Sequence, residues 1–183
     1  MNIFHAHYEF LKNEADLLLK GALSSDSASL ERFRSSSISP KVAEDPSTLQ
    51  LKYALQVIAT ENDYATWSDL KAALDHAAET SPLAEVTDQF YPKGLTTYWN
   101  IWFAHYSQAK KVLLEGKGYL LPFKNQFFIV EEHFVDSIGI PQTLPEWEAI
   151  GNDWAHPKKV KPWLALNERY AAAIAARTAP AAP

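Results

Sequence analysis

Two pairs of residues in the second half of the chain combine an acid and a histidine at helical spacing. His133 precedes Asp136 by three positions, and Asp153 precedes His156 by the same separation. Side chains three positions apart share one face of a helix, and imidazole and carboxylate groups are common ligands of divalent metals. If the two segments converge in the fold, all four side chains could ligate one metal ion. A metal-assisted, hydrolase-like enzyme is therefore one candidate function.

The same pairs also have an ordinary structural interpretation. The motif that holds metals in helical bundles places Glu before His, whereas His133 comes before its acid. His156 is followed by Pro157, which disfavours helical backbone at the histidine. Carboxylates such as those of Glu131 and Glu132 are common in the first turn of a helix. Helix-end acids and surface histidines therefore remain the alternative to a metal site.

A second group of candidates lies in the most apolar segment, which its spacing predicts to be a helix from about residue 97 to residue 115. Large apolar side chains cover most of the circumference of this predicted helix, which is typical of a central element. Aromatic walls with a few polar groups are also typical of ligand pockets, and a lone histidine can lie at a pocket edge. Packing in the core is the alternative role. The candidate ligand-binding residues are Trp99, Trp102, His105 and Tyr106.

No catalytic motif identifies a reaction. The chain contains no cysteine, which excludes disulfides, thiolate nucleophiles and cysteine-based zinc sites. Neither the G-x-S-x-G motif of serine hydrolases nor the G-x-x-x-x-G-K-[ST] phosphate-binding loop occurs. Catalytic residues and cofactors therefore stay unassigned, and whether the chain is an enzyme stays open.

Composition and charge restrict the kinds of partner. With 183 residues, 47% hydrophobic and 13% aromatic, the chain can build one domain with a substantial core. A formal net charge of −5 gives no general attraction to phosphate backbones, which disfavours a nucleic-acid partner. No stretch approaches the roughly 18 apolar residues that span a bilayer, and the first residues lack the pattern of a secretory signal. A cytoplasmic protein without a membrane partner is expected.

The periodicity of apolar residues predicts a mainly α protein with a helical bundle-like single domain over residues 1–178. One small β-hairpin is predicted at about 119–130, where two runs of β-forming residues flank Lys124 and Asn125. Pro122 favours an edge position for the first of these strands.

Two segments rich in turn-forming residues interrupt the helical pattern. A serine-rich connection covers residues 24–48, and a linker covers residues 80–94. The second of these leaves open an N-terminal helical subdomain, 1–78, beside a main part, 95–178. The last residues, 179–183, are expected to be disordered.

Residues 51–74, LKYALQVIATENDYATWSDLKAAL, carry most of a short helix-turn-helix pattern, A-x-x-x-I-A-x-x-x-G-[FY]-x-[ST]-W-x-x-L. Asp63 stands where the pattern has glycine, and aspartate also adopts the left-handed backbone conformation that such a turn needs. The matching residues are Ala54, Ile58, Ala59, Tyr64, Thr66, Trp67 and Leu70. The segment resembles a signature of uncharacterised bacterial helical proteins, seen near ankyrin repeats and glyoxalase-like domains. This resemblance implies a helical hairpin and brings no site residue with it.

Two classes of function follow from these observations. The first is a non-enzymatic module that binds a protein partner or a small ligand through an aromatic-lined pocket. The second is the metal-assisted enzyme built on the two His/Asp pairs. DNA binding by the helix-turn-helix segment is disfavoured, because its second helix, WSDLKAALDHAAE, has three acids, one lysine and no arginine.

Overall fold

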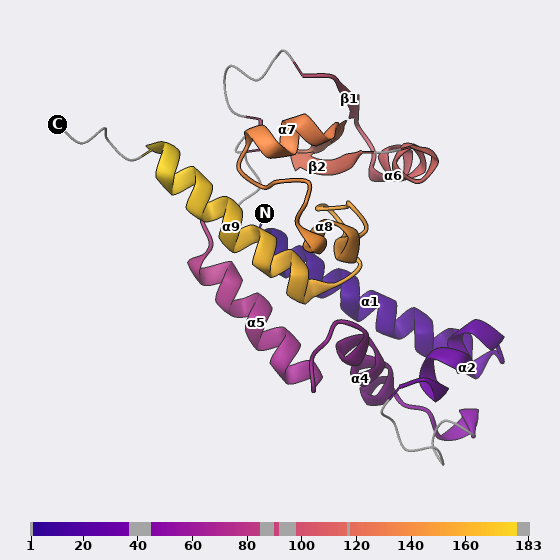
Figure 1. The fold of residues 1–183 in the computed structure, drawn as a ribbon. Coiled ribbons are helices and arrows are strands. Elements are labelled where there is room, and N and C mark those ends of the chain that lie inside the picture. Colours follow the sequence, from indigo (N-terminus) through magenta and orange to yellow (C-terminus); the bar gives the residue numbers. More distant parts are fainter. Residues whose placement is uncertain (1, 37–44, 85–89, 92–97, 117, 179–183) are drawn as a thin grey trace. The chain divides into compact units, whose positions relative to one another are not determined.

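The computed structural model describes residues 2–36, 45–84, 90–91, 98–116 and 118–178, and this part of the chain is mainly helical with one small antiparallel sheet (Figure 1). The prediction of a mainly α fold with a hairpin at about 119–130 is confirmed. The chain divides into two compact units, Phe4–Glu79 and Met1–Ile3 with Thr80–Pro183. The predicted disordered tail, 179–183, lies outside the described residues.

The first unit is helical. Apolar residues recur along its longest helix every three or four positions, and this face is buried. The next helix begins after Asp26, whose carboxylate accepts a hydrogen bond from the backbone N–H of Ser29 at 2.8 Å. The elements of the unit are α1 (Ile3–Leu23), α2 (Ser27–Arg34), a 3-10 turn η1 (Pro46–Thr48), α4 (Leu51–Glu61) and α5 (Trp67–Thr80).

Helices α4 and α5 are joined by a short turn at the place expected from the sequence of residues 51–74. Asp63 adopts the left-handed conformation in the turn, with φ of 65°. The Thr66 hydroxyl accepts a hydrogen bond from the Asp69 N–H, and the Asp69 carboxylate accepts one from the Thr66 N–H, both at 3.1 Å. This reciprocal cap satisfies donors at the start of α5. The ring of Trp67 then packs 5.4 Å from that of Tyr8 on α1.

The second unit is built around a three-stranded antiparallel sheet in the order β1-β3-β2, with β3 in the centre. Its strands are β1 (Asn100–Phe103), β2 (Tyr119–Phe123) and β3 (Gln126–Val130). Pro122 lies in β2, an edge strand, where its missing N–H costs no ladder hydrogen bond. The helices of the second unit are α6 (Tyr106–Glu115), α7 (Glu132–Ser137), α8 (Pro145–Ile150) and α9 (Val160–Thr178).

The prediction of one central helix over 97–115 is wrong. Residues Asn100–Phe103 form β1, whose Trp102 lies opposite Phe128 of β3, and α6 begins only at Tyr106. The run from Ile101 to Phe103 is short, apolar and β-forming, and such a run fits either a strand or a buried helix. Hydrogen bonding to β3 stabilises the strand conformation of this run. The central element of the unit is therefore β3 and not the predicted helix.

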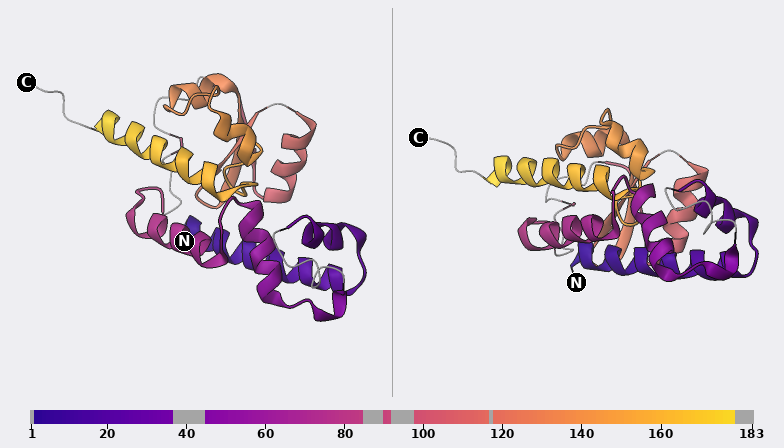
Figure 2. Two further views of the ribbon diagram at one scale, coloured as in Figure 1. Left: turned by 60° about the horizontal axis from the view of Figure 1, so that its bottom comes forward. Right: turned by 90° about the horizontal axis from the view of Figure 1, so that it is seen from below.

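The core of the second unit is aromatic, and the side chains of Trp147, Trp154 and Trp163 are all buried in it. Trp154 lies between rings of other elements, with centroid distances of 5.5 Å to Trp147, 4.9 Å to Phe90 and 6.2 Å to Tyr170. Helix α9 packs on α8 in this region (Figure 2). In the described part of the chain, no helix combines the length and the apolar character that crossing a membrane requires.

Candidate functional site

The segment that follows α8 returns along the edge of the sheet and carries a buried acid. Gly151 and Asn152 both adopt the left-handed conformation, which reverses the chain after the helix. The N–H of Leu120 in β2 donates to the carbonyl of Asn152 at 2.8 Å, and the N–H of Trp154 donates to the carbonyl of Leu120 at 2.9 Å. These two bonds fix the backbone of Asp153 beside β2 as a parallel bridge.

The carboxylate of Asp153 is completely buried and is surrounded by donors. Its Oδ2 accepts hydrogen bonds from the Tyr106 hydroxyl at 2.7 Å and from Lys110 Nζ at 2.8 Å. Its Oδ1 accepts from the backbone N–H of His156 at 2.9 Å. Tyr106 and Lys110 are four positions apart, so both reach the acid from one face of α6. The buried negative charge is therefore paired and hydrogen-bonded, as burial of a charge requires.

Tyr106, Lys110, Asp153 and His156 together form what we call the Asp153 cluster. The rings of Tyr106 and His156 lie 4.1 Å apart, with 55° between their planes. Burial and the charge of Asp153 raise the pKa of Tyr106 well above its ordinary value, so its hydroxyl stays a donor. Burial lowers the pKa of His156 more than Asp153 raises it, and Lys110 lowers it further. At neutral pH this imidazole is uncharged.

The lowered pKa of His156 predicts a loss of stability in mild acid. A proton binds the unfolded chain more readily than the folded one, so the contribution of this histidine is present above its ordinary pKa of 6.5 and is lost as the pH falls below it. The free energy of unfolding, measured by urea denaturation, should therefore fall less between about pH 7 and about pH 5 in His156→Gln than in the native sequence. His105→Gln, which alters an exposed histidine of the same unit, should keep the native slope. Equal drops in the two variants would contradict this assignment.

A second candidate site lies just beyond the C-terminal end of β3, where the chain enters α7. A pocket with a volume of about 770 Å³ opens there to solvent, and we call it the α7 pocket. Trp99 contributes a side chain that remains 53% exposed, a large fraction for the largest apolar residue. The pocket is lined by Tyr98, Trp99, Glu131, His133, Asp136 and Ser137.

The residues around α7 hold the polar wall of this pocket in place. Phe134 and Val135 are buried beneath the helix and anchor it to the unit. Asp136 Oδ1 accepts a hydrogen bond from the backbone N–H of Gln142 at 2.8 Å, which ties the carboxylate to the following loop. Glu131 directly precedes the helix, and its side chain makes no capping bond. Because one face of α7 is buried, the acids on its other face point toward solvent.

The predicted ligand-binding residues are divided among different surroundings. Trp99 lines the α7 pocket, whereas Tyr106 belongs to the Asp153 cluster. Trp102 stacks on Phe128 with ring centroids 4.8 Å apart and donates from its indole nitrogen to Asn100 Oδ1 at 2.7 Å. His105 is exposed at the residue before α6. Of the four, Trp99 is the one among the described residues that line the α7 pocket.

The four residues predicted as metal ligands also separate into two pairs. His133 and Asp136 line the α7 pocket, and Asp153 and His156 lie in the Asp153 cluster. Within the ranges that the structure describes, no three His, Cys, Asp or Glu side chains are grouped as a metal ion requires. The two predicted sites are thus regrouped, because each observed site takes residues from both of them.

Four contributors to these sites are not among the candidate residues that the sequence indicates. Lys110 follows Tyr106 by one helical turn, but nothing in the sequence indicates that both face Asp153, more than 40 positions away. The sequence indicates Glu131 only as a residue of a helix start, places Tyr98 within a predicted helix and gives Ser137 no role, yet all three line the α7 pocket. Comparison of the chain with protein-family models, curated proteins and solved structures gives no match, so its own geometry has to carry the functional interpretation.

Proposed function

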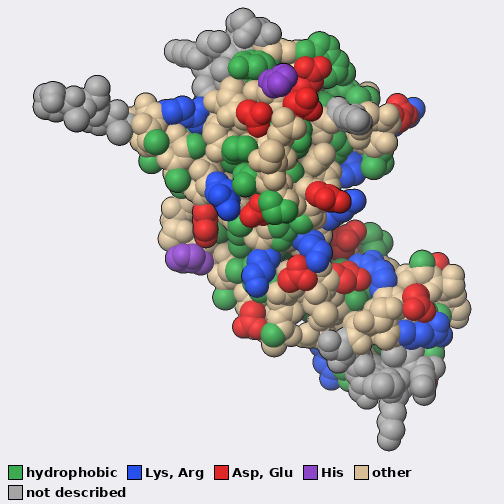
Figure 3. Space-filling view, viewed as in Figure 1, with side chains coloured by type: hydrophobic (Ala, Val, Ile, Leu, Met, Phe, Trp, Pro, Cys, Tyr) green, Lys and Arg blue, Asp and Glu red, His purple; other side chains and the backbone are tan. Residues whose placement is uncertain are grey.

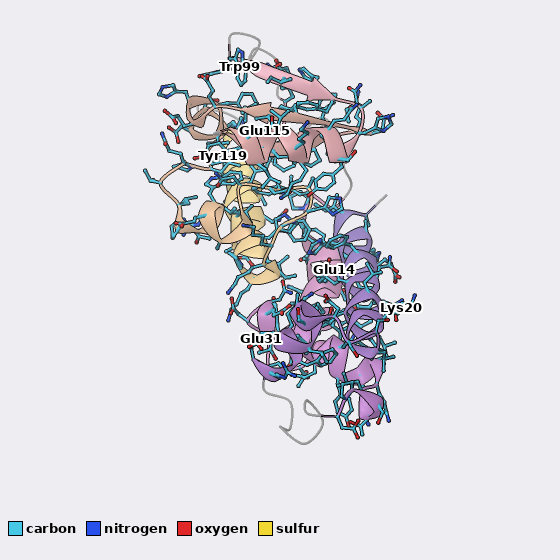
Figure 4. The ribbon with its side chains drawn as sticks, turned by 90° about the vertical axis from the view of Figure 1, so that its right-hand side faces the viewer. Glu14, Lys20, Glu31, Trp99, Glu115 and Tyr119 are labelled. Atoms are coloured by element: carbon cyan, nitrogen blue, oxygen red, sulfur yellow. The ribbon has the colours of Figure 1, made fainter. Side chains whose placement is uncertain are left out.

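We propose that this protein is a non-enzymatic binding module and that its ligand, or a group of a partner protein, docks in the α7 pocket. The exposed indole of Trp99 in the pocket wall is the observation that carries this proposal. Leaving so large an apolar ring in water forgoes the free energy of burial, and binding of a ligand recovers it. Figure 4 shows Trp99 at the start of β1, away from the layer of side chains between the sheet and the helices.

The polar groups of the pocket support the same function. Glu131, Asp136 and Ser137 supply polar groups to the lining of the pocket, while the Tyr98 and Trp99 rings supply the aromatic part. Small-ligand sites commonly combine an aromatic wall with a few polar groups that orient the ligand. Because α7 is anchored by buried Phe134 and Val135, these groups are held in position before a ligand arrives.

The Asp153 cluster is better explained as a structural element than as a reaction centre. Both carboxylate oxygens of Asp153 already accept hydrogen bonds, and the ammonium group of Lys110 is paired with it. Tyr106 is protonated and donates to the same acid, because its pKa is raised. These donors and acceptors satisfy one another, so the binding pocket rather than this cluster supports the function best.

A ligand-observed NMR screen of the full chain tests the proposal. The panel contains amines, carboxylic acids and neutral aromatic compounds, and at least one class is expected to bind the native protein and to lose its signal in Trp99→Ala. Since Trp99 is half exposed, this substitution should change the free energy of unfolding by no more than about 0.5 kcal/mol. The matched control is Trp102→Ala, which removes another partly exposed tryptophan, three positions later in β1 and outside the residues that line the pocket. Binding that survives in Trp99→Ala, or no binding by any class, would overturn the proposal.

A further inference from the structure

Among the carboxylate, lysine and arginine side chains, the lining of the α7 pocket contains only acids. Glu131, Glu132 and Asp136 lie within six positions of one another, and no lysine or arginine is among the residues that line the pocket. On the face shown in Figure 3, acidic side chains gather in the region of α7. Their field extends beyond the pocket, since Glu132 and Asp136 add to the burial that raises the pKa of Tyr119. The pocket therefore repels anions and attracts cations.

The two acids that line the pocket are not equivalent. Asp136 accepts hydrogen bonds from the backbone N–H and the side-chain amide of Gln142, so its carboxylate is held in a fixed orientation. In the part of the chain that the structure describes, the carboxylate of Glu131 has neither a hydrogen-bond donor nor an ion-pair partner. Glu131 is therefore the acid that can pair with an incoming positive group without losing an existing contact.

The aromatic wall selects among cations. The faces of Trp and Tyr rings carry negative electrostatic potential and attract a positive group placed over them. An ammonium group with alkyl substituents suits this wall, because its methyl groups contact the rings while its charge faces a carboxylate. A bare metal ion instead needs several converging ligands, and the described residues around the pocket contain no such group.

We propose that the α7 pocket binds an alkylated ammonium group, with Trp99 and Tyr98 against its methyl groups and Glu131 opposite its charge. This inference rests on the proposed binding function and names the chemical class of the ligand. The pocket is open to solvent, so the ammonium group enters while the body to which it is attached stays outside. Such a group is available on small molecules and on methylated lysine side chains, and both share the recognised chemistry.

The test uses two probes of equal shape and different charge on the full chain. Choline carries a trimethylammonium group, and 3,3-dimethylbutan-1-ol replaces its nitrogen by carbon. Calorimetric or NMR titration should give a dissociation constant at least about tenfold lower for choline than for the alcohol. Glu131→Gln should weaken choline binding about five- to tenfold and leave binding of the alcohol unchanged.

The control variant is Glu132→Gln, which makes the same change of net charge one position away, at an exposed side chain that does not line the pocket. It should alter choline affinity less than about twofold, since screening weakens a charge that does not touch the ligand. Equal effects of Glu131→Gln and Glu132→Gln would overturn the assignment of Glu131 as the contacting acid.

The remaining outcomes separate this inference from the proposed function. If choline and the alcohol bind equally, or if carboxylic acids bind and choline does not, the ammonium class is overturned while a pocket dependent on Trp99 stands. If Trp99→Ala leaves all binding unchanged, both proposals fail.

A trimethyllysine peptide serves as the third probe and distinguishes the two sources of the ammonium group. Tighter binding of the peptide than of choline assigns a protein partner, and weaker binding assigns a small molecule. Both results support the ammonium class.

Discussion

Replacing Asp153 by alanine is expected to lower the free energy of unfolding by about 3–5 kcal/mol. The substitution leaves the ammonium group of Lys110 partly buried without its counter-charge, with 26% of that side chain exposed. It also removes the acceptor of the Tyr106 hydroxyl and of the His156 backbone N–H. Polar groups that lose an acceptor in a water-poor interior keep the cost of their desolvation without the hydrogen bond that offset it. Urea denaturation followed by tryptophan fluorescence measures the loss.

Fluorescence suits this experiment because it reports mainly on the unit that contains Asp153. Of the six tryptophans, Trp67 lies in the unit Phe4–Glu79 and the other five lie in the unit that includes Thr80–Pro183. The control is Glu115→Ala in the same unit, whose acid pairs with Lys111 on an exposed face of α6. It should cost less than about 1 kcal/mol. A loss at Asp153 no larger than at Glu115 would show that the buried pairing contributes little.

A double variant gives a second check on the same pair. Lys110→Met removes the unpaired ammonium group that Asp153→Ala leaves behind, so the combined loss should be smaller than the sum of the single losses by about 1–3 kcal/mol. Strict additivity would mean that the two side chains do not interact in the folded protein, despite the 2.8 Å between Lys110 Nζ and Asp153 Oδ2.

Truncation of Trp154 to alanine is expected to cost about 3–5 kcal/mol as well, through a different mechanism. This side chain is completely buried among the rings of Phe90, Trp147 and Tyr170, and none of these can close the space that it leaves. The lost contacts and the remaining cavity add to each other. Chemical denaturation of the purified variant, monitored by far-UV circular dichroism, gives the value.

Two phenylalanine variants separate packing from hydrogen bonding in this core. The indole N–H of Trp154 has no hydrogen-bond partner among the described residues, whereas that of Trp147 donates to the carbonyl of Ile140 at 3.2 Å. Trp147→Phe leaves that buried carbonyl unsatisfied, so it should cost about 1 kcal/mol more than Trp154→Phe. The reverse order would indicate that the hydrogen bond of Trp147 contributes nothing to stability.

Local sequence patterns predict the elements that depend on local contacts. The spacing of apolar residues marks α1, and Thr66 with the turn at Asp63 marks the junction of α4 and α5. The hairpin of β2 and β3 is also visible, although the turn residue with positive φ is Lys124 and not Asn125. In each case the residues that decide the conformation lie within a few positions of one another.

The features that sequence patterns miss depend on partners far away in the chain. Residues Asn100–Phe103 become a strand only because β3, more than 20 positions later, offers a ladder of hydrogen bonds. The two sites have the same origin. Trp99 meets His133 and Asp136, and Tyr106 meets Asp153, across separations of 34 or more positions that no spacing rule connects. Residue types identify these side chains as candidates for a binding or catalytic site, but only the fold determines which of them lie close together.

The division of the chain has a consequence for how the protein can vary. The unit Phe4–Glu79 lies within the sequence of the other unit, which contains Ile3 before it and Thr80 after it. The N–H of Ile3 donates to the carbonyl of Ala84 at 2.8 Å, so the outgoing and returning chain are joined at one point. At the level of the gene, one uninterrupted stretch of codons encodes the helical unit. Insertions and deletions within it can accumulate during evolution without shifting the alignment of residues 98–158, where both candidate sites lie.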